Sequence, residues 1–123
     1  MVAGILCKNE EFLIASRNKN KILNDCWEFP GGKVEKNENI FLALKRELKE
    51  ELSIEIKMPS ILFDNYFYDY PTISLEIFFF KCRDWNGYIK PVEGQKIKWV
   101  KKEEIKNIKL LPSNDKVLKK LFL

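Results

Sequence analysis

One amphipathic segment in the middle of the chain most restricts the possible folds. Between about Glu38 and Leu52, the apolar residues Phe41, Leu44 and Leu48 and the final leucine recur at steps of three or four, which predicts a helix with one buried face. A helix of this kind has to cover an apolar surface that is made elsewhere in the chain. The segments on both sides of it therefore decide the architecture.

These flanking segments are rich in β-branched and aromatic residues. Residues 2–7 and 12–17 predict a hairpin around "KNEE", because two short strand-like runs enclose a polar connection. Residues 61–70 and 72–82 predict two paired strands that are joined near Pro71. Strands thus precede and follow the central helix.

The remaining segments complete a mixed α and β pattern. "KIKWV" predicts a further strand, "DCWEFPGGKVEKNE" (residues 25–38) predicts a loop, and "DWNG" predicts a turn. Residues 112–123 predict a second helix, with Ser113 or Asn114 as its N-cap. This order predicts an α/β (α+β) fold in which helices cover one sheet, and the length fits a single domain over residues 1–123.

Composition excludes several kinds of site. The chain contains no histidine, so Ser-His-Asp triads, Cys-His dyads and His-ligated zinc are excluded. Cys7, Cys26 and Cys82 are odd in number and form no CxxC pair, which indicates packing residues. The apolar run 77–80 is far shorter than the roughly 20 residues of a membrane-spanning helix, and "MVAGILC" lacks the features of a secretory signal. We therefore expect a cytoplasmic protein with no membrane partner.

Three glutamates project from one face of the predicted helix. Glu47, Glu50 and Glu51 fall within about 100° of arc, since offsets of three and four residues share a helical face. Glu47 and Glu51 are like charges at i,i+4, which costs a helix roughly 0.2–0.5 kcal/mol. A solvated acidic face is one interpretation. The upstream glycine loop favours another, in which these carboxylates and a backbone carbonyl near Gly31 or Gly32 supply the oxygen ligands that Mg²⁺ prefers.

Residues 31–54, "GGKVEKNENIFLALKRELKEELSI", resemble the Nudix box. Five residues separate Gly32 from Glu38, and seven more lead to "REL" and then "EE" at the spacing of that family. Ser53 departs from the pattern, because the family usually has Gly there. A serine in a left-handed cap costs up to about 1 kcal/mol, unless the helix ends differently. Asn37 stands where related boxes often carry Gly, and Asn is the residue other than Gly that best tolerates positive φ.

The resemblance covers nearly the whole chain and is closest to MutT-like nucleotide pyrophosphohydrolases. "WEFPGG" precedes the box as in those proteins, and "LPSND" is similar to their "PPAN" segment. The resemblance implies a Nudix-type α/β/α sandwich with a mixed β-sheet between helices. It also implies dependence on Mg²⁺, with Mn²⁺ as an alternative ion. The implied reaction converts a nucleoside triphosphate to the monophosphate and pyrophosphate by attack of water on the β-phosphorus.

The resemblance further implies roles for individual residues near the phosphates. The implied metal ligands are the Gly31 carbonyl, Glu47, Glu50, Glu51 and Glu93, and the implied catalytic residues are Glu47, Glu50 and Arg46. Glu47 would accept or orient the proton of the attacking water, although Glu93 competes for that role. Arg46 would orient the carboxylates, while Gly32 and Glu38 would support the loop and the helix.

A second group of residues is implied in substrate binding. The candidates are Arg17 and Lys33 for the phosphates, Asn114 and backbone groups at Phe29 for the base, and Tyr70 or Phe78 for the lining of the base pocket. Arg can hold phosphate oxygens bidentately, and Lys acts as a point charge. A solvated side chain is an equally good interpretation of Lys33. An aromatic residue in a strand is more often part of the core.

These assignments give 8-oxo-dGTP or 8-oxo-GTP as the expected substrate. 8-Oxoguanine carries a donor at N7 where guanine has an acceptor, so a pocket that pairs with the oxidised base leaves groups unpaired with the normal one. The alternatives are hydrolysis of CTP, a dinucleoside polyphosphate or a nucleotide sugar, or a non-catalytic nucleotide-binding module. The hypothesis of a nucleic-acid-binding domain is supported only by the net charge of +4 and by aromatic residues in the predicted strands. We therefore expect no obligate nucleic acid partner. We also expect a monomer.

Overall fold

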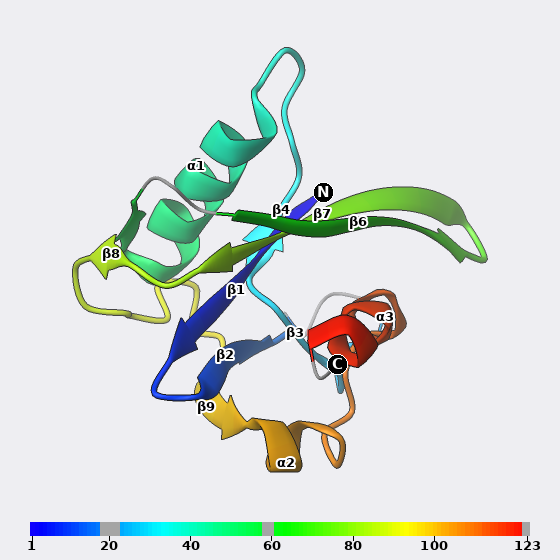
Figure 1. The fold of residues 1–123 in the computed structure, drawn as a ribbon. Helices are drawn as coiled ribbons and strands as arrows, with labels where there is room; N and C mark the ends of the chain where they lie inside the picture. Colours follow the sequence, from blue (N-terminus) through cyan, green and yellow to red (C-terminus); the bar gives the residue numbers. More distant parts are fainter. Residues whose placement is uncertain (18–22, 58–60, 122–123) are drawn as a thin grey trace.

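A mixed seven-stranded β-sheet forms the centre of the computed structural model, which describes residues 1–17, 23–57 and 61–121 (Figure 1). Its strands are β1 (Val2–Lys8), β2 (Glu11–Ser16), β3 (Trp27–Glu28), β4 (Gly31–Gly32), β6 (Ile61–Tyr70), β7 (Ile73–Cys82) and β9 (Ile97–Lys101). The path runs β3-β2-β1-β7-β6, while β4 also pairs with β1 and β9 with β2. Strands β1 and β7 are parallel, and the other pairs are antiparallel.

Helices lie on both faces of this sheet (Figure 1). They are α1 (Ile40–Leu52), α2 (Lys102–Ile105) and α3 (Pro112–Leu121), and a separate two-stranded sheet consists of β5 (Glu55–Ile56) and β8 (Trp85–Asn86). Within the described residues, no helix is both long enough and apolar enough to cross a membrane. The mixed sheet and the helices on its two faces confirm the predicted α+β sandwich with a mixed sheet between helices.

Alternation along the strands divides the core into two layers. Val2 and Leu6 of β1 pack in a cluster with the buried face of α1, whereas Ala3 and Ile5 pack in a second cluster with α2 and α3. This division follows from the period of two in a strand, which sends successive side chains to opposite faces. One strand thus anchors both helical layers.

Helix α1 is capped by a polar residue at each end. Its N-cap is Asn39, whose Oδ1 accepts hydrogen bonds from the N–H groups of Phe41 (2.8 Å) and Leu42 (3.3 Å), so the helix begins two residues later than predicted. Ser53 ends the helix in the left-handed conformation with φ of 60°, and Asn37 has φ of 63°. Both residues therefore keep the geometry for which the Nudix pattern uses glycine.

Several short elements differ from the predictions. Trp85 and Asn86 of the predicted "DWNG" turn form strand β8, in which Trp85 stacks on Trp99 with ring centroids 6.2 Å apart. Local turn propensity cannot predict this contact between distant residues. The predicted loop at 25–38 contains β3 and β4, and α2 was not predicted. Such two- to four-residue elements depend on neighbours that are distant in sequence.

The N-terminus of the last helix differs from the prediction in its cap. Helix α3 begins at Pro112, a residue that suits the first helical position because it has no N–H to leave unpaired. Ser113 and Asn114 therefore lie in the first turn, and the prediction that one of them is the N-cap is wrong. The final two residues of the predicted helix, 122–123, lie outside the described residues.

Candidate active site

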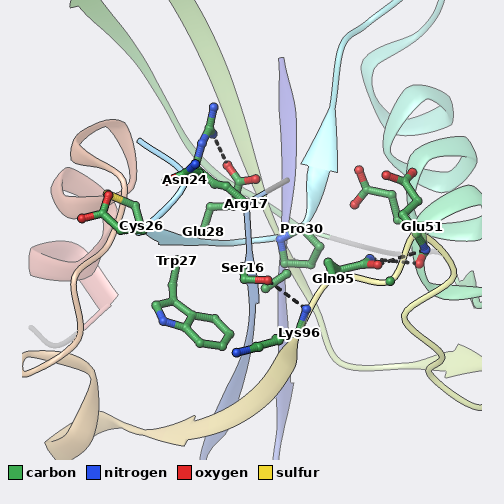
Figure 2. Close-up of a pocket in the computed structure, with 14 residues that line it drawn as sticks. Ser16, Arg17, Asn24, Cys26, Trp27, Glu28, Pro30, Glu51, Gln95 and Lys96 are labelled. Atoms are coloured by element: carbon green, nitrogen blue, oxygen red, sulfur yellow. Dashed lines mark hydrogen bonds and ion pairs between the residues drawn. The ribbon is translucent and has the colours of Figure 1, made fainter. Parts of the chain in front are cut away.

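Two neighbouring cavities meet at the acidic helix. The first has a volume of about 490 Å³, and its walls include Gly31 and Gly32 of β4, Glu47 and Glu51 of α1, and Asn114 of α3. The second has a volume of about 580 Å³ and is drawn in Figure 2. The residues common to both walls are Arg17, Glu28, Glu51 and Glu93.

The three glutamates of α1 have different surroundings. The Glu47 side chain is 15% exposed and the Glu50 side chain 58% exposed. Glu47 and Glu51 line the first cavity, whereas Glu50 lies outside the walls of both cavities. The structure therefore places two of the three predicted helical ligands at the cavity.

The two glycines of β4 bring this helix close to the sheet. A Cβ on Gly32 would lie 2.3 Å from Cδ of Glu47, and a Cβ on Gly31 would lie 2.0 Å from the carbonyl oxygen of Val2. Neither distance is compatible with a side chain unless something moves. Gly32 thus leaves the space that the Glu47 carboxylate occupies.

Arg46 connects the carboxylates of the helix to the loop before it. Its Nε and Nη2 donate to the two oxygens of Glu38 at 2.9 Å each, and Nη1 donates to Oε1 of Glu47 at 2.9 Å. Nη2 also donates to the carbonyl of Lys33 (2.9 Å), and the contact of Nη1 with Glu50 is longer at 3.5 Å. A guanidinium suits this position because its rigid fork presents several donors at once.

This arrangement shifts the titration of its members. Hydrogen bonding from Arg46 lowers the pKa of the Glu38 carboxyl to about 2, with a further contribution from the backbone at Glu35. The same contacts with Glu38 and Glu47 raise the pKa of Arg46. Both side chains therefore stay charged over the physiological range, and the position of Glu47 is coupled to Glu38.

The loop that carries Glu93 is tied to the end of α1. The carbonyl of Glu51 accepts hydrogen bonds from the N–H of Val92 (3.0 Å) and from Nε2 of Gln95 (3.2 Å). Oε1 of Gln95 in turn accepts the N–H of Glu93 at 3.0 Å. Figure 2 shows Gln95 against Glu51. Sequence reasoning overlooked Gln95, which lies two residues after Glu93.

The predicted phosphate contacts lie on the cavity walls. Nη1 of Arg17 forms an ion pair with Oε2 of Glu28 at 2.8 Å (Figure 2), and both residues border both cavities. Lys33 lines the first cavity. Glu28 was not predicted as a site residue, because its role as a partner of Arg17 depends on the pairing of β2 with β3.

The part of the first cavity that is lined by Asn114, Ser113 and Tyr70, called its neutral end below, carries uncharged side chains. Oδ1 of Asn114 accepts the backbone N–H of Phe29 at 2.9 Å, and Nδ2 donates to Oγ of Ser113 at 3.2 Å. The Tyr70 hydroxyl donates to the same Ser113 oxygen at 2.7 Å. The Phe29 ring is buried against Phe79 in the core. Ser113 was considered only as a cap, so its contact with Tyr70 was missed.

The two aromatic candidates for the base pocket have different positions. Tyr70 lines the first cavity, together with Asn114 and Ser113. Phe78 instead packs against the core cluster under α1 and is absent from the walls of this cavity. For Phe78 the core interpretation therefore holds.

The donor set at the charged end fits a hard divalent cation. Among the residues described, no three acidic or thiol side chains are already arranged to hold a metal ion. Glu47, Glu51 and Glu93 nevertheless border one cavity, and carboxylate oxygens are the ligands that Mg²⁺ takes in proteins. Binding would require these side chains to turn toward a common point.

The fold and the acidic helix beside a glycine loop define a family. The chain matches the NUDIX domain model over residues 1–121, so it belongs to the Nudix family and is a Nudix hydrolase, as the box predicted. Nudix hydrolases generally depend on a divalent metal ion.

Individual relatives extend this finding. The 8-oxo-dGTP diphosphatase of Buchnera aphidicola subsp. Schizaphis graminum is 34% identical over 96% of this chain and 88% of its own length. A solved MutT structure from work on Aliivibrio salmonicida and Vibrio cholerae is 34% identical, with a TM-score of 0.81 over 97% of this chain and 92% of that one. The CTP pyrophosphohydrolase of Escherichia coli is 30% identical over 93% of this chain and 84% of its length. The resemblance to MutT-like proteins is therefore confirmed.

Proposed function

We propose that this chain is a single Nudix domain that hydrolyses 8-oxo-dGTP and 8-oxo-GTP to the monophosphate and pyrophosphate, and so removes oxidised nucleotides before they enter nucleic acid. One observation carries the proposal. A single cavity is lined both by carboxylates of α1 and by a buried carboxamide, Asn114 of α3. Its volume of about 490 Å³ lies in the range of small-molecule sites. The relatives named 8-oxo-dGTP diphosphatase support the same substrate.

The charged end is proposed to hold Mg²⁺, or Mn²⁺ in its place. The proposed ligands are the Gly31 carbonyl, Glu47, Glu50, Glu51 and Glu93. Of these, Glu50 would have to rotate away from Arg46, since its present contact is the 3.5 Å pair with that residue. When bound, the ion neutralises phosphate charge and lowers the pKa of a water molecule at the site.

The residues of this chain would then position the reactants and move one proton. Glu47 is the proposed acceptor for a proton of the attacking water, because its carboxylate lines the cavity and is fixed by Arg46. The water oxygen bonds to the β-phosphorus while the bond from that phosphorus to the α,β-bridging oxygen breaks. The nucleoside monophosphate leaves with the bridging oxygen. Arg17 and Lys33 are the proposed phosphate contacts, since both line the cavity.

The neutral end is proposed to bind the base. Because Asn114 is only 4% exposed, a nucleobase beside it would lose its hydrogen bonds to water. It would form hydrogen bonds with the Asn114 amide instead. A carbonyl oxygen has two lone pairs, and among the residues that the structure describes Phe29 is the only one that donates to Oδ1 of Asn114. That oxygen can therefore also accept the N7 hydrogen that distinguishes 8-oxoguanine from guanine.

Another nucleotide is the second candidate substrate. The E. coli relative that is named a CTP pyrophosphohydrolase is nearly as similar as the 8-oxo-dGTP diphosphatases. The second cavity of about 580 Å³ also adjoins the acidic residues Glu51 and Glu93 and offers room for a larger group beyond the phosphates. CTP, dinucleoside polyphosphates and nucleotide sugars are therefore the competitors.

A substrate panel tests the proposal. Purified protein with Mg²⁺ is assayed on 8-oxo-dGTP, 8-oxo-GTP, dGTP, CTP, a dinucleoside polyphosphate and a nucleotide sugar, with monophosphate and pyrophosphate both quantified. The expected result is the highest kcat/KM with the oxidised guanine nucleotides. Equal turnover of dGTP and 8-oxo-dGTP would reject the proposed base preference. Size-exclusion chromatography with light scattering checks the expected monomer.

A further inference from the structure

A continuous chain of hydrogen bonds joins strand β6 to the neutral end of the first cavity. Tyr70, the last residue of β6, donates to Oγ of Ser113 at 2.7 Å. The same oxygen accepts from Nδ2 of Asn114 at 3.2 Å, and Oδ1 of Asn114 accepts the N–H of Phe29 at 2.9 Å. Ser113 and Asn114 are 1% and 4% exposed. Water therefore competes little for these bonds.

The backbone N–H of Phe29 identifies which atom of the Asn114 carboxamide is the oxygen. A backbone N–H can only donate, so the Asn114 atom beside it has to be the oxygen. The amide nitrogen is then on the side of Ser113. It carries two hydrogens, of which one is used by Ser113. The other has no partner within residues 1–17, 23–57 and 61–121 and can point to a ligand in the cavity that Asn114 lines.

Tyr70 holds Ser113 through two bonds. Besides donating to Oγ, its hydroxyl oxygen accepts the backbone N–H of Ser113 at 3.2 Å. This N–H belongs to the first turn of α3, where no carbonyl within the helix is available as its acceptor. With its side chain and backbone both tied to Tyr70, Ser113 presents its oxygen as an acceptor to Asn114. Without that hydroxyl, Oγ is free to turn and to donate instead.

We propose that Tyr70, acting through Ser113, is a positioning residue that keeps Nδ2 of Asn114 as a hydrogen-bond donor toward the base. The cavity then selects a nucleobase with a carbonyl group facing Asn114 over one with an amino group there. Two donors that face each other in a buried site both lose their hydrogen bonds, and this rejects the wrong base. The inference rests on the proposed function, since it requires the base of the nucleotide to occupy this cavity.

A matched pair of nucleotides tests the inference. 2-Amino-8-oxo-dATP carries a 6-amino group where 8-oxo-dGTP has its 6-carbonyl, with the accompanying loss of the N1 hydrogen. The ratio of kcat/KM for the two is measured in the wild type, Tyr70→Phe, Ser113→Ala and the double variant. Tyr68→Phe is the control, because its ring lies only 4.7 Å from that of Tyr70 between centroids but its hydroxyl takes no part in this chain of bonds.

We expect the wild type to prefer 8-oxo-dGTP by at least about 10²-fold. Each single variant should lower this ratio about tenfold, mainly through a higher KM for 8-oxo-dGTP. The double variant should lower the ratio no further, since both residues act on the same amide. Tyr68→Phe should keep the wild-type ratio. Tyr70→Phe should also have a lower thermal midpoint than Ser113→Ala, because only the former removes the acceptor of the Ser113 N–H.

The outcomes separate this inference from the proposed function. A wild type that strongly prefers 8-oxo-dGTP, with the ratio unchanged in both single variants, overturns the inference and leaves the proposed function intact. A drop in thermal midpoint without a change in ratio has the same meaning, because it shows a structural role only. A wild type without a preference for the carbonyl, or without turnover of either nucleotide, overturns both. Should Tyr70→Phe fail to fold, Ser113→Ala decides alone.

Discussion

The two ends of the first cavity differ in charge, burial and origin. At the α1 end, Glu47 is held by the charged Arg46, and Glu50 beside it is 58% exposed. At the α3 end, Asn114 and Ser113 are neutral, almost fully buried and bonded to Tyr70 and to the backbone. A hydrated, charged end suits a cation and phosphates, which exchange with water. A dry, neutral end suits base selection, because unpaired groups are most costly where water cannot reach them.

The largest effect on kcat is expected when the proposed proton acceptor at the charged end is removed. Glu47→Gln should lower kcat with 8-oxo-dGTP by about 10²- to 10⁴-fold and leave the ratio between the two 8-oxo nucleotides unchanged. Initial rates of pyrophosphate release with Mg²⁺ measure this. Glu103→Gln on the exposed surface of α2 is the matched control. An unchanged rate in Glu47→Gln, with an unchanged thermal midpoint, would remove Glu47 from the mechanism.

A smaller effect is expected when the Glu47 carboxylate is moved and not removed. In Gly32→Ala the new Cβ would lie 2.3 Å from Cδ of Glu47, so the carboxylate has to shift. Since displacement of a catalytic group by about 1 Å can cost 10²-fold, we expect a loss of up to about that size in kcat. The same rate assay is used, with thermal unfolding to show that the fold persists. Full activity would mean that the observed Glu47 position is not the one used in turnover.

The charged end should also give a pH-dependent contribution to stability. Because Arg46 lowers the pKa of Glu38 from 4.5 to about 2 in the folded protein, ionised Glu38 stabilises the fold above its unfolded pKa. This contribution is lost as the pH falls from 4.5 to about 2. The free energy of unfolding of the wild type should exceed that of Glu38→Gln at neutral pH, and the difference should disappear near pH 2. Urea titrations across this range measure it; a difference independent of pH would contradict the coupling.

The smallest expected effect concerns the end of α1, away from both ends of the cavity. Ser53 has φ of 60°, and glycine adopts that conformation without a Cβ penalty. Ser53→Gly should raise the free energy of unfolding by up to about 1 kcal/mol, with no change in kcat/KM. Ser53→Ala, which retains the Cβ, is the matched control for the urea titrations. Destabilisation by Gly would show that the serine contributes a contact that outweighs its backbone cost.

The sequence predicts the charged end better than the neutral end, for a physical reason. The box at 31–54 is continuous, so helical spacing alone brings Glu47 and Glu51 to one face, and the fold class follows from the periods of two and 3.6. The neutral end combines Phe29, Tyr70 and Ser113 with Asn114, which come from three distant parts of the chain. Their hydrogen bonds depend on how α3 packs beside β6 and β3, and no local pattern reports that packing.

The same distinction explains the errors in detail. Ser113 and Asn114 look like caps because local propensity assigns such residues to helix ends, but tertiary contacts with Tyr70 and Phe29 recruit them into the first turn. The "DWNG" segment has the composition of a turn, yet Trp85 stacks on Trp99 and lies in β8, which pairs with β5. Only the consequences of local sequence, such as the positive φ of Asn37, could be predicted residue by residue.

The most direct test of the two-ended site is a crystal structure with Mn²⁺ and 8-oxo-dGMP, with the metal located by its anomalous scattering. We expect anomalous density among Glu47, Glu51 and Glu93, and the base at the neutral end, within hydrogen-bonding distance of Asn114. Metal bound elsewhere, or a base that lies outside the cavity while the Asn114 amide keeps only its protein partners, would contradict it.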